Sequence, residues 1–195
     1  ITPAVENNGN PDNLAAQASS AGIATAKGWK VQYENGTDIS TTGTTTCEQL
    51  IPPANALVIT LTVIPNVSIH FTMQGDAENT PVWIEPAPGM YLATTVSNLH
   101  SIDAEYSTVG TTMKVYGNIT SFNCSRNIPS ITGINVENNP WLKELNCSEN
   151  FITTLDLSHN PELELLVCHR NGLQKLDLSH NPKIKEVFCK SNESL

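Results

Sequence analysis

The chain has 195 residues, of which 39% are hydrophobic, and this is enough for one or two packed domains. A formal charge of −9 repels phosphate backbones, which argues against nucleic acid as a partner. No apolar run approaches about 18 residues, so the sequence predicts no insertion into a membrane.

Residues 1–33 predict a short helix followed by a strand. Ser20 is a suitable N-cap for a helix that runs to Lys27, and Gly28 is a suitable stop signal. The stretch WKVQY that follows the glycine has the composition of a strand.

Residues 34–50 are rich in Gly, Thr and Ser and are expected to form a linker, whereas residues 51–116 predict six strands. Short apolar runs with alternation, separated by Pro, Gly, Asn and Asp, are typical of a small antiparallel β-sandwich. The runs are ALVITLTVI (56–64), VSIHFTMQ (67–74), TPVWIEP (80–86), MYLATTVS (90–97), LHSIDAEYS (99–107) and TTMKVYG (111–117).

Residues 117–195 carry a repeat with a period of 21 residues. The blocks Leu142–Glu162 and Leu163–Lys183 share the pattern L-x-x-L-x-C-x-x-N-x-L-x-x-L-D-L-S-x-N-P. A looser copy precedes them, with two extra residues after Asn127, and an incomplete copy begins at Ile184. A fixed period of this length predicts stacked coils that bury a common core.

Apolar residues alternate within each unit as they do in a short strand. We expect Leu145 and Cys147 to point inward, and Asn146 and Ser148 to point outward. The two leucines of the later LDL triplet are expected to line the opposite wall in the same way. Stacked coils can bury both walls against one another at the strand spacing of about 4.8 Å.

Asparagines recur at two positions of the unit. Those of the first set fall where the chain turns inward, and their amides are expected to bond backbone groups of the turn and form a ladder. Those of the second set precede proline and mark the other corner. The first set is Asn127, Asn150, Asn171 and Asn192, and the second set is Asn139, Asn160 and Asn181.

Four of the five cysteines follow the repeat spacing, and no C-x-x-C pair of a zinc framework is present. Side chains in register on parallel strands point the same way, so the torsion of about 90° that a disulfide needs is hard to reach. We therefore expect free, buried and unreactive thiols at Cys124, Cys147, Cys168 and Cys189. Cys47 lies outside this column and has no evident partner.

The segments NCSRN, NCSEN and LDLSHNP resemble the leucine-rich repeats of secreted or surface proteins of Bacteroidetes and of the Listeria internalin type. The resemblance covers residues 113–195 and implies a flat, weakly curved solenoid with strands in both halves of each unit. VWIEPAPG, residues 82–89, resembles the β module that precedes such repeats. Gly9–Pro11 and Gly22–Trp29 resemble the closing cap of an upstream array, which implies that the chain is a piece of a longer protein.

The residue types that carry chemistry do not form a site in the sequence. His159 and His180 stand one unit apart beside Asp156 and Asp177, but repetition alone explains this, and a closed set of metal ligands is missing. No G-x-S-x-G and no glycine-rich phosphate loop occurs. The sequence therefore predicts no enzyme, no metal and no cofactor. An enzyme would need a deep polar pocket between the sandwich and the first coil.

The outward face of the strand column remains as the candidate binding surface. Exposed apolar side chains beside a basic edge often mark a contact with another protein. The alternative is that later coils cover or shape this surface. The predicted ligand-binding residues are Glu144, Asn146, Leu165, Val167, His169, Arg170, Glu186, Phe188 and Lys190.

The sequence thus predicts a mainly β protein, secreted or on the cell surface, that acts without catalysis. The resemblance implies adhesion, with the strand face binding a protein or glycan that could come from a host. The alternative is a structural spacer in a larger bacterial surface protein, with no ligand of its own. An exposed last coil around Phe188 further predicts an end-to-end dimer.

Overall fold

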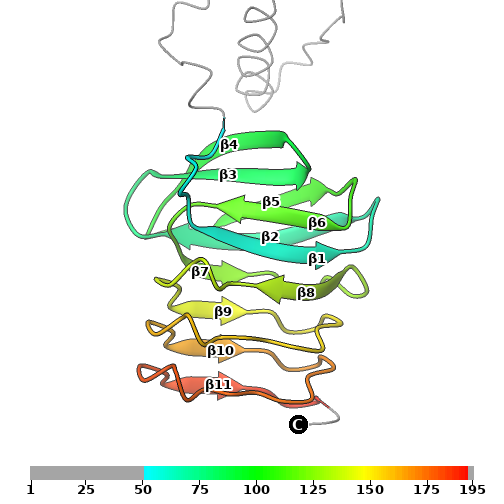
Figure 1. The fold of residues 1–195 in the computed structure, drawn as a ribbon, viewed down its shortest axis with the longest axis vertical. Coiled ribbons are helices and arrows are strands. Elements are labelled where there is room, and N and C mark those ends of the chain that lie inside the picture. The colour runs from blue at the N-terminus through cyan, green and yellow to red at the C-terminus, as the bar shows by residue number, and fades with distance from the viewer. Residues whose placement is uncertain (1–50, 193–195) are drawn as a thin grey trace, which may run out of the picture. The chain divides into compact units, whose positions relative to one another are not determined.

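The structure, a computed structural model, describes residues 51–192 apart from the side chains of Ile102 and Ala104. The helix and strand expected in residues 1–33 and the linker expected in 34–50 lie outside the described residues. The described part is mainly β and contains no helix, so none of its elements has the length and apolar character needed to cross a membrane as a helix (Figure 1).

The strands form two sheets. The five-stranded sheet has the order β4-β3-β6-β1-β8, and each neighbouring pair is antiparallel. The six-stranded sheet has the order β11-β10-β9-β7-β2-β5, in which β7, β9, β10 and β11 run parallel to one another and β2 is antiparallel to both of its neighbours. The bounds are β1 (Val58–Val63), β2 (Ser68–Gly75), β3 (Thr80–Ala87), β4 (Met90–Val96), β5 (Ile102–Ser107), β6 (Thr112–Tyr116), β7 (Ile119–Asn123), β8 (Ile131–Asn135), β9 (Glu144–Asn146), β10 (Leu165–Val167) and β11 (Glu186–Phe188).

Each of the six runs expected to be strands in residues 51–116 contains one strand, β1 to β6. Alternation aims one face of β1, β2, β3 and β6 at a common core. Ile59 and Leu61 of β1 are fully buried, and the ring of Phe71 in β2 lies 5.5 Å from that of Phe122 in β7. Buried residues of both sheets and of the coils belong to one hydrophobic cluster.

The front strands and the repeat coils share both sheets. β2 pairs with β7, and β1 pairs with β8, so the expected boundary between residues 116 and 117 falls within continuous hydrogen-bonded sheets. The described residues from Pro52 onward belong to one compact unit. The chain crosses from β6 to β7 at Gly117, whose φ is +138° and where a Cβ would lie 2.8 Å from the carbonyl oxygen of Pro81. Only glycine fits this crossing without strain.

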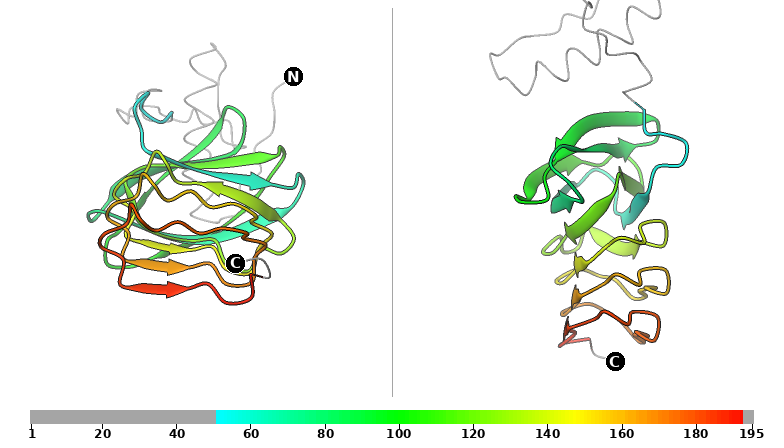
Figure 2. Two further views of the ribbon diagram at one scale, coloured as in Figure 1. Left: turned by 60° about the horizontal axis from the view of Figure 1, so that its bottom comes forward. Right: turned by 90° about the vertical axis from the view of Figure 1, so that its left-hand side faces the viewer.

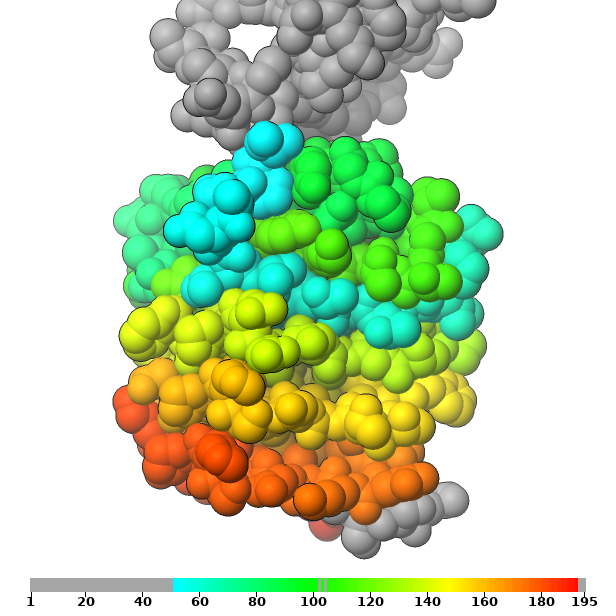
Figure 3. Space-filling view, in the orientation of Figure 1, coloured from blue at the N-terminus to red at the C-terminus, as the bar shows by residue number. Residues whose placement is uncertain are grey.

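The repeat units stack as coils. The first coil is the looser copy before Leu142, the second is residues 142–162 and the third is residues 163–183. Asn123, Asn146, Val167 and Phe188 lie side by side on successive parallel strands, so residues 23 or 21 apart in the sequence are neighbours in space. Figure 2 shows these strands along one wall and the turns along the other, and in Figure 3 successive coils lie directly against one another.

The second wall differs from the expectation. Its leucines are buried in the second unit, with Leu155 8% and Leu157 1% exposed, and half-buried in the third, at Leu176 and Leu178. However, β8 is the only strand on this wall among residues 117–192. The expectation of strands in both halves of every unit is therefore wrong for the later coils. On this wall the second and third coils share one backbone–backbone hydrogen bond, from the Gly172 N–H to the Ile152 carbonyl. No strand pairing follows it.

The first asparagine set forms the expected ladder. The Nδ2 group of Asn150 donates to the carbonyl of Cys147 in its own coil at 3.0 Å and to the carbonyl of Cys124 in the coil before at 2.9 Å. Asn171 repeats this arrangement one coil later, as does Asn192. Each amide thus joins two coils at a corner where the strand ladder has already ended, and it satisfies carbonyls that would otherwise be buried without partners.

The asparagines before proline form a second ladder at the opposite corner. Asn160 Nδ2 donates to the carbonyls of Val136 and Asn139 at 3.0 and 2.9 Å, and Asn181 donates to the equivalent pair one coil later. Asn139 heads this column but has no coil before it. Its side chain is fully buried, yet neither its Nδ2 nor its Oδ1 has a hydrogen-bond partner.

This difference gives a matched pair of substitutions. Asn160→Leu removes two donated bonds and leaves buried carbonyls unpaired, so we expect the free energy of unfolding to fall by about 2–4 kcal/mol. Asn139→Leu removes an amide that has no partner and replaces it with an apolar group of similar shape, so we expect a change of less than about 1 kcal/mol or a gain in stability. Urea unfolding followed by circular dichroism measures both. Equal losses in the two variants would contradict the ladder.

The cysteine column lies inside the coils as expected. Cys124, Cys147 and Cys168 are buried free thiols, and Cys189 is half-buried. Burial raises the pKa of Cys124 and Cys168 to about 12. Burial also raises the pKa of Cys147 well above its ordinary value, and the thiols of Cys124 and Cys168 on either side raise it further.

These shifts predict chemical protection and alkaline instability. In the native protein at pH 8, iodoacetamide should label Cys124, Cys147 and Cys168 far more slowly than it labels them in guanidinium, as mapped by mass spectrometry. Their contribution to stability is complete below the unfolded pKa of about 9 and is lost as pH rises towards about 12, because the unfolded chain releases these protons first. Cys147→Ala should flatten this alkaline decline. Fast native labelling of Cys147 would contradict the buried column.

Candidate functional site

Six of the nine predicted binding residues lie on the outward face of the six-stranded sheet, and the strand pairing arranges that face in two rows. Side chains alternate along each strand, so every second residue shares the face. One row contains Gln74, Ser121, Glu144, Leu165 and Glu186. The other contains Asp103, Thr72, Asn123, Asn146, Val167 and Phe188.

Exposure along these rows changes from strand to strand. Glu144 and Glu186 are exposed, whereas Leu165 and Val167 are half-buried and Phe188 is 50% exposed. Along the strand order seen in Figure 1, the second row therefore runs from an acid at β5, a hydroxyl at β2 and amides at β7 and β9 to apolar side chains at β10 and β11. The predicted apolar patch is present, but only its last member projects strongly into solvent.

Ser148 is a correction to the expected outward face. It is buried, with 3% exposed, because its N–H and its Oγ both donate to Asn146 Oδ1, at 3.1 and 2.7 Å. These two bonds form a turn at the end of β9, and they engage the side-chain oxygen of Asn146 within the protein. The Nδ2 group of Asn146 is the part of this predicted site residue that is left for a ligand.

The predicted basic edge lies at the turns that follow the strands. Arg126, Glu149 and Arg170 occupy equivalent positions, each with a positive φ of 52° to 61°. Glu149 Oε1 lies 3.5 Å from Arg170 Nη1 and 3.9 Å from Arg126 Nε, so one carboxylate stands between two guanidinium groups. His169 is half-buried and Lys190 is exposed. Arg170 is therefore held in a column of charges rather than standing alone beside the apolar residues.

The front strands add residues to this face that sequence reasoning missed. The imidazole Nε2 of His70 in β2 contacts the carboxylate of Asp103 in β5, and Ser68 Oγ donates to Glu105 Oε1 at 2.7 Å. Alternation in the run VSIHFTMQ could have placed His70 on an outward face. That this face continues the repeat face depends on the pairing of β2 with β7, which connects residues about 50 positions apart and leaves no local signal.

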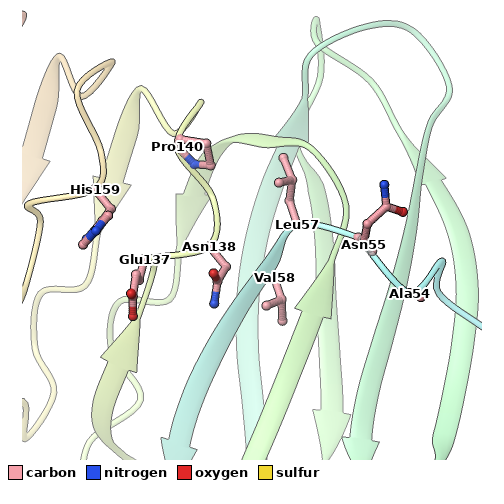
Figure 4. Close-up of a pocket in the computed structure, with 9 residues that line it drawn as sticks. Ala54, Asn55, Leu57, Val58, Glu137, Asn138, Pro140 and His159 are labelled. Carbon is pink, nitrogen blue, oxygen red and sulfur yellow. The ribbon is translucent and has the colours of Figure 1, made fainter.

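Two grooves lie on the other wall of the coils. The first, of about 580 Å³, lies between residues 54–58 and the corner at 137–140, and Figure 4 shows Glu137 and His159 on its repeat side. No serine, threonine, cysteine or lysine is among the described residues that line it. It therefore offers a carboxylate and an imidazole without a nucleophile beside them.

The second groove, of about 650 Å³, contains Asp156, Asp177 and His180. The N–H and hydroxyl groups of Ser158 hold the pKa of Asp156 below its ordinary value, and Ser179 does the same for Asp177. Both carboxylates therefore favour the ionised form, and each already accepts a hydrogen bond from the serine two residues later in its own turn. Within residues 51–192, no three His, Cys, Asp or Glu side chains are grouped so that they could hold a metal ion. His159 and His180, which stand one unit apart in the sequence, line different grooves.

Comparisons of the chain with protein-family models, with curated proteins and with solved structures found no match.

Proposed function

We propose that the chain is a non-catalytic recognition or adhesion module, secreted or on the cell surface, and that it binds a protein or glycan through the outward face of the six-stranded sheet. In this proposal residues 51–116 are a small β-sandwich that leads into a leucine-rich repeat solenoid of the bacterial surface type. The ligand is held by shape and charge complementarity, without cofactor or metal.

The observation that carries the proposal is the continuity of the sheet face across the front strands and the coils. Six strands in register present their outward side chains on one sheet, and the four inner strands are hydrogen-bonded on both sides. A surface that is ordered before binding loses little conformational entropy when a ligand binds. Such a face suits the recognition of an extended or flat partner.

The composition of the face supports a partner with both polar and apolar parts. Carboxylates and amides of the β5 to β9 section can bond hydroxyl or amide groups, and Val167 and Phe188 can cover an apolar group. The half-buried state of Leu165 and Val167 favours the alternative, a structural spacer with no ligand, because little of their apolar surface is left for a partner.

A binding array separates these two functions. Glycans and extracellular proteins of a host are probed with the wild-type chain, with Val167→Glu and Phe188→Glu on the face, and with Thr154→Glu as an exposed control on the other wall. We expect ligands that lose at least about tenfold in affinity with either face variant and are unaffected by the control. Equal binding by all four chains would remove the proposed face, and the absence of any ligand would support the spacer.

The expected end-to-end dimer through the coil of β11 stays a prediction. Val187 is 36% and Phe188 50% exposed on this coil, and pairing with a second copy would bury both. Static light scattering at increasing protein concentration should show a dimer for the wild type and a monomer for Phe188→Glu. A wild-type monomer at high concentration would contradict it.

A further inference from the structure

A second surface lies at the corner where the strands of the coils end. The Ile64 N–H donates to the Ser130 carbonyl at 2.9 Å, and the Phe151 N–H donates to the Ile131 carbonyl at 3.0 Å. These bonds attach two segments to the loop 128–131: Ile64, which directly follows β1, and Phe151, which follows the strand β9 and its turn in the second coil. Residues far apart in the sequence therefore meet at one corner.

The side chains at this corner are apolar and exposed. Ile128 and Phe151 are each 53% exposed, and Ile64 is 36% exposed. Two exposed prolines follow Ile64 and Ile128 directly. We name this surface the corner patch, and its members are Ile64, Pro65, Ile128, Pro129 and Phe151.

Packing of the coils does not require these side chains. The bond from the Phe151 N–H to the Ile131 carbonyl is equivalent to the bond from Gly172 to Ile152 one coil later, so the repeat accepts glycine where Phe151 stands. Ile128 and Pro129 are the two residues that the first unit has in excess of the repeat. Large apolar groups that stacking does not need, and that remain in solvent, are typical of a contact surface.

Arginines border the corner patch. Arg126 precedes its loop, with 82% of its side chain exposed, and Arg170 has 65% exposed, whereas Glu149 between them has 25% exposed. The three groups sum to a positive edge in a chain whose formal charge is −9. Charge complementarity therefore favours a partner that carries carboxylates.

Two other occupants fit less well. A second copy placed patch to patch would bring Arg126 and Arg170 close to the same arginines of its partner, and these like charges would repel. A neutral glycan stacks on flat aromatic rings, and Phe151 is the only aromatic residue of the patch.

We propose that the corner patch with Arg126 and Arg170 is a docking site for an acidic segment of a partner protein, in which a large apolar residue lies next to aspartate or glutamate. The apolar residue covers Phe151 and Ile128, and the carboxylates meet the arginines. Apart from Arg170 this site shares no residue with the proposed sheet face, and it does not depend on that function.

The test uses the full chain of residues 1–195, immobilised and probed with a phage-displayed library of random dodecapeptides. We expect enriched peptides to place Phe, Trp or Leu within two positions of Asp or Glu. Fluorescence polarisation of the enriched peptide should show a loss of at least about tenfold in affinity for Phe151→Ser and for Arg126→Glu. Binding should also weaken as salt rises, because the charges are exposed.

Trp141 provides the matched control, since it is an aromatic residue with the same 53% exposure as Phe151 but follows the Asn-Pro corner of its own coil. Trp141→Ser and Phe188→Ser should leave the affinity unchanged, and circular dichroism checks that every variant is folded.

Failure to enrich peptides, enrichment of basic peptides, or unchanged affinity in Phe151→Ser would overturn the site. Loss of binding in Phe188→Ser alone would assign the peptide to the sheet face instead. A dimer that Phe151→Ser dissociates in sedimentation experiments would identify a second copy as the occupant and would also overturn it.

Discussion

One kind of hydrogen bond holds the coils in register: the side-chain amide of a corner asparagine donates to a backbone carbonyl of the coil before. In the first set it also donates to a carbonyl of its own coil, and in the second set both acceptors belong to the coil before. The strands β9 to β11 have only three residues each, so their ladder is too short to fix the corners. The amides act where the chain leaves the ladder, and their carbonyl partners would be costly to bury unpaired. Because two such columns stand at opposite corners, each coil is attached at both ends of its turn.

The same constraint explains how the front strands serve the repeat. A first coil has no coil before it, so the side-chain amides at its corners need other partners. On one corner His70 of β2 supplies them, since its N–H donates to Asn127 Oδ1 and its carbonyl accepts from Asn127 Nδ2 at 2.9 and 2.7 Å. On the other corner β1 covers the coil, and the side-chain amide of Asn139 is left without a partner. The front strands therefore continue the sheets of the repeat more completely than they continue its asparagine columns.

Stacking in register also decides what the surface can offer. Any side chain that recurs in the unit becomes a column, so charges and apolar groups gather into stripes without any local signal beyond the period. Two surfaces result in the described part of the chain: a flat sheet face that changes from polar to apolar, and a corner at which apolar groups stand beside arginines. Both are fixed by backbone bonding rather than by flexible loops, which suits recognition by shape and charge.

The sequence by itself determined the elements that depend on local periodicity. Alternation located β1 to β6, and the 21-residue period placed Cys124, Cys147 and Cys168 in one buried column and Asn150 in its ladder, because identical positions of stacked units must be neighbours. The tertiary structure decided what depends on pairing between distant segments. The pairing of β2 with β7, and hence the extent of the sheet face, has no local signal. The bonding of Ile64 and Phe151 to neighbouring carbonyls of the same loop has none either. Ser148 was expected outside by alternation, but the bonds of its N–H and hydroxyl to Asn146 turn it inward. A repeat fixes which residues stack, whereas long-range hydrogen bonds decide which faces of the stack remain open.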